Sequence, residues 1–158
     1  MSDSWESFID VLTQECAAFG ALNERALELS VALVQNVPDK IHSTRRAVED
    51  ARKGLVAVRS RRRAMQQRGF GNMTLKKVSC YAPPRIATQI QARIRQLTYY
   101  TIKLDLVNSN NKALILGAME RLMAIVAVIR RVQAQPLTYK RRGIVAPPDH
   151  SMIVSHKV

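Results

Sequence analysis

The stretch that decides the fold runs from Ile90 to Val132 and reads IQARIRQLTYYTIKLDLVNSNNKALILGAMERLMAIVAVIRRV. Its apolar or small positions recur at alternating steps of four and three residues for six heptads, which is typical of coiled-coil-like helix packing. Asn108 and Asn111 occupy two successive positions of this repeat. We expect both to be core polar residues that fix the helix register or bond a partner helix; the alternative is a local wet layer or a break in the helix. The pattern predicts one long helix over about residues 84–135.

Two shorter helices are predicted before it, over about residues 4–37 and 39–68. Each carries an apolar stripe at helical spacing. Pro38 separates them, because a proline pushes the preceding residue out of the helical conformation. The short turn makes these two helices antiparallel neighbours. Residues 69–82 show no clear period and are expected to form a linker.

Composition also favours helices. A chain of 158 residues suits one domain, and an aromatic content of 5% is too low for a β-sandwich or barrel. Cys16 and Cys80 are too few for a disulfide scaffold, and Cys16 falls on the apolar stripe as a small core residue. We therefore predict an all-α fold, an antiparallel bundle of three long, coiled-coil-like helices within residues 1–135. Residues 136–158, with three prolines and no period, are expected to form a mobile C-terminal tail.

The net charge of +13 is unevenly distributed. Residues 1–38 hold six acidic and one basic side chain, and the carboxylates are expected to form a solvated face. The run Arg59-Ser60-Arg61-Arg62-Arg63 could neutralise phosphates and bind nucleic acid, although aromatic residues to stack on bases are few. The alternative is a plain solvated face that complements the acidic first helix.

Catalytic and metal-binding patterns are hard to find. The three histidines are scattered, and none stands at metal-ligand spacing with cysteines or acids. We expect that the chain is not an enzyme and takes no cofactor. The apolar stretch Ala113–Ile129 is interrupted by Glu120 and Arg121, and the N-terminus lacks the basic and apolar regions of a secretory signal. A cytoplasmic protein is therefore expected.

Several of these residues together resemble the FlgN-like family of flagellar type III export chaperones. The resemblance covers roughly residues 5–145. Its features are Leu12, Glu15 and Leu22 in the first helix, a basic second helix, and Asn108-x-x-Asn111-x-x-Leu114 in the long last one. Tyr139 and Gly143 follow the end of that helix. The strongly basic balance departs from the acidic character of many such chaperones.

The resemblance implies a cytoplasmic helical bundle that holds the hook-associated proteins of the hook–filament junction until they are secreted. It also implies that Tyr139 docks to the export-gate membrane protein. An apolar stripe can hold a client helix in a groove, and methionines let such a surface repack around several clients. The predicted client-binding residues are Leu114, Ile115, Met119, Leu122, Met123, Val126, Ile129, Leu137, Ile144 and Val145. A nucleic-acid binder and a coiled-coil adaptor remain alternatives, and a homo-oligomer is possible in each case.

Overall fold

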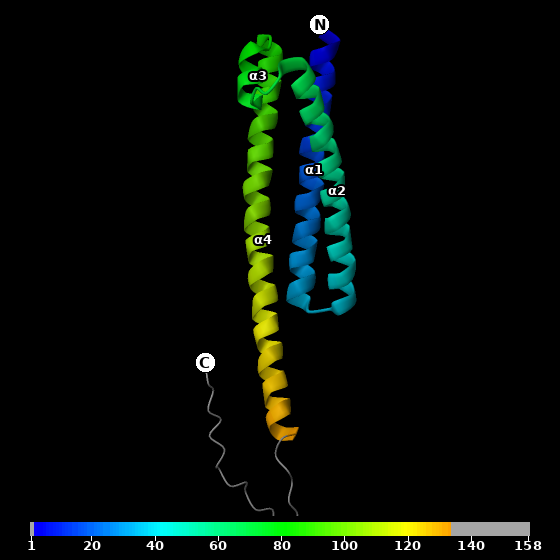
Figure 1. Ribbon diagram of the computed structural model, residues 1–158, viewed down its shortest axis with the longest axis vertical. Helices are drawn as coiled ribbons and strands as arrows, with labels where there is room; N and C mark the ends of the chain where they lie inside the picture. The colour runs from blue at the N-terminus through cyan, green and yellow to red at the C-terminus, as the bar shows by residue number, and fades with distance from the viewer. Residues whose placement is uncertain (1, 134–158) are drawn as a thin grey trace, which may run out of the picture. The chain divides into compact units, whose positions relative to one another are not determined.

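The computed structural model describes residues 2–133. Four helices make up this part of the chain, namely α1 (Ser2–Gln35), α2 (Pro38–Phe70), α3 (Leu75–Tyr81) and α4 (Pro84–Gln133) (Figure 1). Residues 2–133 contain no strand, so the all-α prediction is confirmed for them. The chain divides into two compact units, one ending at Ile115 and the other beginning at Leu116 within α4.

The turn between α1 and α2 follows from its sequence. Asn36 adopts a left-handed conformation, with φ of 52°, which asparagine tolerates better than most residues. Val37 is extended, with φ of −101° and ψ of 107°, because Pro38 follows it. Pro38 then opens α2 at a position where its missing N–H is not needed. Within the first unit, α1 and α2 therefore lie side by side and antiparallel (Figure 1).

Helix α2 ends at Phe70, and Gly71 follows it with a positive φ of 62°, which favours glycine. Thr74 then caps α3, its hydroxyl oxygen accepting a hydrogen bond from the Lys77 backbone N–H at 3.3 Å. Helix α3 lies inside the stretch that was predicted to be a linker, and Val78 on it is completely buried. Two turns are too short to display a hydrophobic period, so only the Thr74 cap marked this helix in the sequence.

The core of the first unit consists of two clusters. Phe8 and Leu12 of α1 meet Val78 of α3 and Ile90 of α4 in the first cluster. The second joins Phe19 and Leu22 of α1 to Leu55 of α2, with Tyr100 and Leu104 of α4 packed against it. Every cluster includes α1, so this helix connects the other elements.

Helix α4 runs parallel to α1 within the first unit, and three side chains of α1 reach it at heptad spacing. Cys16 donates its thiol hydrogen to the Arg93 carbonyl at 3.7 Å, and Asn23 Nδ2 donates to the Tyr100 carbonyl at 3.1 Å. Ser30 donates its hydroxyl hydrogen to Asn111 Oδ1 at 2.6 Å. The packing between α1 and α4 is therefore partly polar.

At two positions of the predicted repeat, the residue of α4 that packs toward α1 is the one just before the predicted residue. Val107 is buried and Tyr100 half-buried, whereas Thr101 and Asn108 are exposed. The prediction of Asn108 as a core polar residue is therefore wrong. Asn111 is buried, and its Nδ2 donates to the Ala26 carbonyl at 3.1 Å.

Gly20 explains part of this register. A Cβ atom at Gly20 would lie 3.2 Å from Tyr100 Oη, so only glycine leaves comfortable room for the tyrosine ring. Tyr100, rather than Thr101, can thus turn toward α1. Glycine inside a helix costs about 1 kcal/mol relative to alanine. At Gly20 the absence of a side chain lets the ring of Tyr100 pack close to the backbone of α1.

Candidate partner-binding surface

The candidate functional site is the apolar surface that α4 carries in the second unit, from Leu116 onward. The seven predicted client-binding residues in the described part of the chain are between 36% and 61% exposed. Leu114 and Ile115 end the first unit, and Met119, Leu122, Met123, Val126 and Ile129 belong to the second. Sequence reasoning missed further exposed apolar side chains in the second unit, namely Leu116, Ile125, Val128 and Val132.

Ile125 and Val132 were left out because they stand on the predicted heptad repeat and were counted as packing positions, whereas Leu116 and Val128 lie outside that repeat. An isolated surface helix of a globular protein normally has one apolar stripe a little over 100° wide. The helical segment Leu116–Gln133 instead carries exposed apolar side chains outside any single stripe. The signal that could have found Ile125 and Val128 is the run Ile125-Val126-Ala127-Val128-Ile129, which is apolar at every position. Contiguous exposed apolar surface of this kind marks an interaction site.

Three further residues predicted for client binding, Leu137, Ile144 and Val145, lie outside the described residues. Tyr139, predicted to dock to the export gate, lies outside them too. Their assignment remains a prediction from the sequence.

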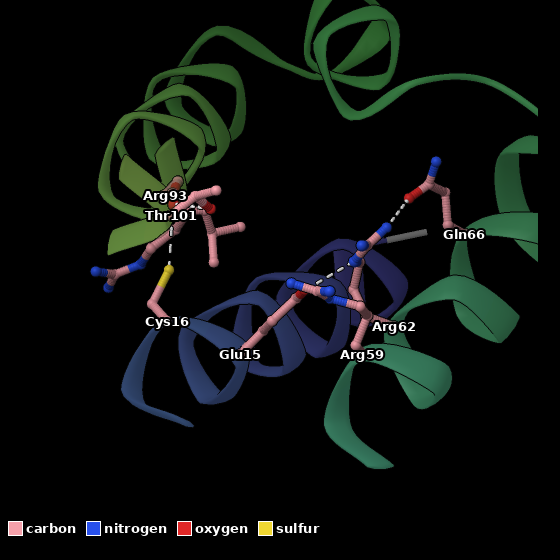
Figure 2. Close-up of polar contacts among 8 residues, drawn as sticks. Glu15, Cys16, Arg59, Arg62, Gln66, Arg93 and Thr101 are labelled. Carbon is pink, nitrogen blue, oxygen red and sulfur yellow. Dashed lines mark hydrogen bonds and ion pairs between the residues drawn. The ribbon is translucent and has the colours of Figure 1, made fainter. Parts of the chain in front are cut away.

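The arginine run of α2 is divided between two environments, of which Figure 2 shows the one that Arg59 and Arg62 share with Glu15. Arg59 Nε donates to Glu15 Oε1 at 3.1 Å, and Arg62 Nε donates to Glu15 Oε2 at 2.7 Å. Arg61 and Arg63 are exposed. Two arginines of the run thus hold α1 to α2, and two face solvent.

Glu15 is almost completely buried, with 1% of its surface exposed. The prediction that the α1 carboxylates form a solvated face is therefore wrong for this residue. The spacing of the sequence indicates this burial, because Glu15 lies seven residues after Phe8 and seven before Leu22, and both of these are core residues. Glu15 and its neighbour Cys16 point in different directions from α1, toward α2 and α4 respectively (Figure 2).

The surface around the exposed arginines has one sign of charge. No Asp or Glu occurs between Ala51 and Leu104, a stretch that covers the second half of α2, all of α3 and the first part of α4. Arg61, Arg63, Arg68, Lys76 and Lys77 are exposed there. This basic surface can attract an anionic partner.

The two thiols differ in environment. Cys16 is buried, and burial raises the pKa of its thiol, an effect that Arg93 partly opposes. Cys80 is exposed. Within residues 2–133, no group of three or more His, Cys, Asp or Glu side chains is arranged to hold a metal ion.

A groove of about 860 Å³, which the sequence did not predict, lies among the N-terminal parts of α1 and α4 and the end of α3. Trp5, Ile9 and Ile86 are among its apolar lining residues, and Glu6 and Arg85 contribute opposite charges. Its walls come from segments far apart in the chain, so no local pattern could reveal it.

None of the helices in residues 2–133 combines enough length with enough apolar character to cross a membrane. Comparison of the chain with protein-family models, with curated proteins and with solved structures finds no match.

Proposed function

We propose that this protein is a cytoplasmic flagellar export chaperone that binds hook-associated proteins and delivers them to the type III export gate. The observation that carries the proposal is the exposed apolar surface of α4 in the second unit, between Leu116 and Ile129. A helix with an exposed apolar surface can bind an amphipathic partner helix, so that the apolar faces of the two helices are in contact. The identity of the client comes from the resemblance to the FlgN-like family described above.

The composition of the surface suits a chaperone. Met119 and Met123 are 51% and 61% exposed, and their unbranched side chains can repack around clients of different shape. The finer description of the fold belongs to the same proposal. The three long helices then form a coiled-coil-like antiparallel bundle. The C-terminal tail predicted for residues 136–158 lies outside the described residues, and its share in client binding is part of the proposal.

The test compares two leucines of α4 that are almost equally exposed. Leu122 is 61% exposed and lies in the proposed surface, while Leu106 is 62% exposed and lies outside it. We expect Leu122→Asp to weaken binding of a hook-associated protein from the same genome at least tenfold, as measured by calorimetry. Leu106→Asp is the matched control and leaves affinity within twofold. Equal affinities of the two variants would contradict the proposed site, and the absence of wild-type binding would contradict the proposed client.

The export-gate step has a separate test. We expect Tyr139→Ala to retain client affinity and to weaken association with the cytoplasmic part of the export-gate membrane protein. A pull-down with each partner measures both effects on one variant. Loss of client binding together with intact gate binding would contradict the role carried over from the family.

A second candidate function is binding of an anionic partner such as nucleic acid. The acid-free stretch from Ala51 to Leu104 favours it, together with the exposed Arg61, Arg63 and Arg68. Arginines and lysines that neutralise phosphates give an affinity that falls steeply with salt. A titration with a generic duplex at two salt concentrations tests this alternative.

A further inference from the structure

The apolar surface of the second unit is too wide for one partner helix. Nine large apolar side chains between Leu116 and Val132 are exposed by 38% to 66%. At about 100° per residue they spread over about 240° of the helix circumference. One core-facing stripe needs little more than about 100°. The nine residues are Leu116, Met119, Leu122, Met123, Ile125, Val126, Val128, Ile129 and Val132.

The first unit supplies a comparison from the same helix. There α4 has the buried positions Ile90, Val107 and Asn111. These three cover about 100° of the circumference. Ile94, half-buried against the same core, widens the packed arc to about 140°, so the packing of α4 in the first unit needs little more than half of the arc that is apolar in the second.

The nine residues divide into two flanks and a centre. Ile125, Val128 and Val132 form the first flank, and Leu116, Met119 and Met123 form the second. Leu122, Val126 and Ile129 lie between them. A helix packed on either flank also reaches the centre, so two helices side by side would cover the whole arc.

Charge indicates the kind of helix that fits. On the same helical projection, Arg121 falls within the first flank and Arg130 within the second. Both arginines are exposed. The exposed Glu120 and Arg131 of the segment lie outside both flanks, so each flank carries only positive charge. A second copy of this segment would bring the same positive charges, and like charges across an interface are unfavourable. A helix with acidic residues beside its apolar face pairs with each arginine instead.

We infer that the segment Leu116–Val132 binds two acidic amphipathic helices of its partner at once, one on each flank. This inference rests on the proposed function, because it specifies how the client occupies the same site. Each partner helix contributes its own apolar stripe, and Leu122 and Ile129 contact both.

The test uses one variant on each flank. Val128 and Met123 are both 61% exposed and lie on opposite flanks. We expect Val128→Asp and Met123→Asp each to weaken binding of the hook-associated protein at least tenfold in calorimetry. Ala124 is exposed and lies between the flanks on the far side of the helix, so Ala124→Asp is the matched control and stays within twofold of wild type. Circular dichroism of each variant, at the temperature of the calorimetry, checks that the helices are retained.

A second measurement identifies the helices themselves. A photo-crosslinking residue at position 128 and another at position 123 should capture two different segments of the client, both acidic. Arg121→Glu and Arg130→Glu should each weaken binding.

The outcomes separate the two proposals. If only one flank variant weakens binding, or both crosslinks reach one segment, a single helix occupies the surface and the inference is wrong while the client site stands. If neither flank variant nor Leu122→Asp weakens binding, the proposed function fails as well. A dimer that dissociates in Val128→Asp during sedimentation would show a second copy as the occupant and overturn the inference.

Discussion

At the scale of single residues, the pair of contacts around Glu15 has the largest expected effect on stability. The carboxylate is buried and accepts from both Arg59 and Arg62, and the Arg62 side chain is only 12% exposed. Removing one partner of a buried ion pair leaves the other charge uncompensated, which costs about 3–5 kcal/mol. The contact therefore matters more for holding α1 to α2 than the exposed pair Arg25–Glu28, in which both side chains are about half exposed.

We predict that Glu15→Ala lowers the free energy of unfolding by about 3 kcal/mol. Urea unfolding followed by circular dichroism measures it. Glu24, which is exposed on the same helix, provides the control, and Glu24→Ala changes the value by less than about 0.5 kcal/mol. Equal effects of the two substitutions would mean that the ion pairs contribute little.

Gly20 gives a second residue-scale prediction, because two effects of similar size oppose each other there. Alanine gains about 1 kcal/mol of helix propensity over glycine. Its Cβ would meet Tyr100 Oη at 3.2 Å and Cζ at 3.4 Å. We predict that Gly20→Ala alone is nearly neutral and that it becomes stabilising by about 1 kcal/mol when Tyr100→Phe removes the hydroxyl.

Gly54 on α2 is the control for this cycle. A Cβ atom there would meet nothing within 4 Å, so Gly54→Ala should raise stability by about 1 kcal/mol in either background. Thermal unfolding of the four combinations measures the coupling. A Gly20→Ala effect that does not depend on residue 100 would rule out the steric explanation.

The Cys16 thiol predicts a dependence of stability on pH. Its pKa is raised above the ordinary value of 9.0 in the folded protein, so the folded state holds the proton more tightly than the unfolded state. The resulting stabilisation is complete below pH 9 and is lost as the pH rises through the folded pKa. The difference in free energy of unfolding between wild type and Cys16→Ala should be constant from pH 7 to 8.5 and shrink above pH 9. A difference that grows with pH would contradict the raised pKa.

At the scale of elements, the relation of α4 to α1 is the most informative. Ile90, Leu97, Leu104 and Asn111 keep strict heptad spacing and all lie toward the packed side. Tyr100 and Val107, each three residues after one of these positions, also face the packed side. The predicted repeat instead placed Thr101 and Asn108 there, each four residues after Leu97 or Leu104. Both choices are compatible with a helix, since residues three and four apart lie on the same side.

We predict that Asn111 and Asn108, three residues apart, respond differently to substitution. Asn111→Ala removes the donor to the Ala26 carbonyl and the acceptor of the Ser30 hydroxyl, and should lower stability by about 2 kcal/mol. Asn108→Ala should change it by less than about 0.5 kcal/mol, because Asn108 is exposed. Thermal unfolding of both variants measures the two effects. Equal losses of stability would favour the predicted register, in which both asparagines are buried, over the observed one.

At the scale of the whole molecule, the two surfaces have different chemistry. The apolar surface of α4 is proposed to bind clients, and the basic surface of α2 and α3 can attract anions. An electrostatic surface loses affinity as salt rises, whereas an apolar one does not. The two activities should therefore respond to different substitutions.

We predict that the triple variant Arg61→Glu, Arg63→Glu, Arg68→Glu loses affinity for a generic DNA duplex and keeps its affinity for the hook-associated protein. Leu122→Asp should do the reverse. Fluorescence anisotropy at about 50 and 200 mM salt measures duplex binding, which is expected to be weak and salt-dependent. Tight duplex binding that persists at the higher salt would favour the nucleic-acid function over the chaperone.

The amino-acid sequence by itself determined the helical class and the place where α1 ends. Heptad spacing and Pro38 act locally, through side-chain direction and backbone sterics, so they can be interpreted without knowing any neighbour. The sequence also singled out apolar residues of α4 that are exposed in the structure, and their role in client binding stays a prediction. The polar core was less accessible, because Asn108 and Asn111 look alike in the sequence.

Only the tertiary structure decided which of these asparagines is buried, which arginines of the α2 run are paired, and that Glu15 lies inside. Each depends on a group supplied by another helix: Ser30 for Asn111, Arg59 and Arg62 for Glu15, and Gly20 for the ring of Tyr100. A buried polar group is stable only where such a partner exists. The register of one helix against another therefore determines what local spacing leaves open.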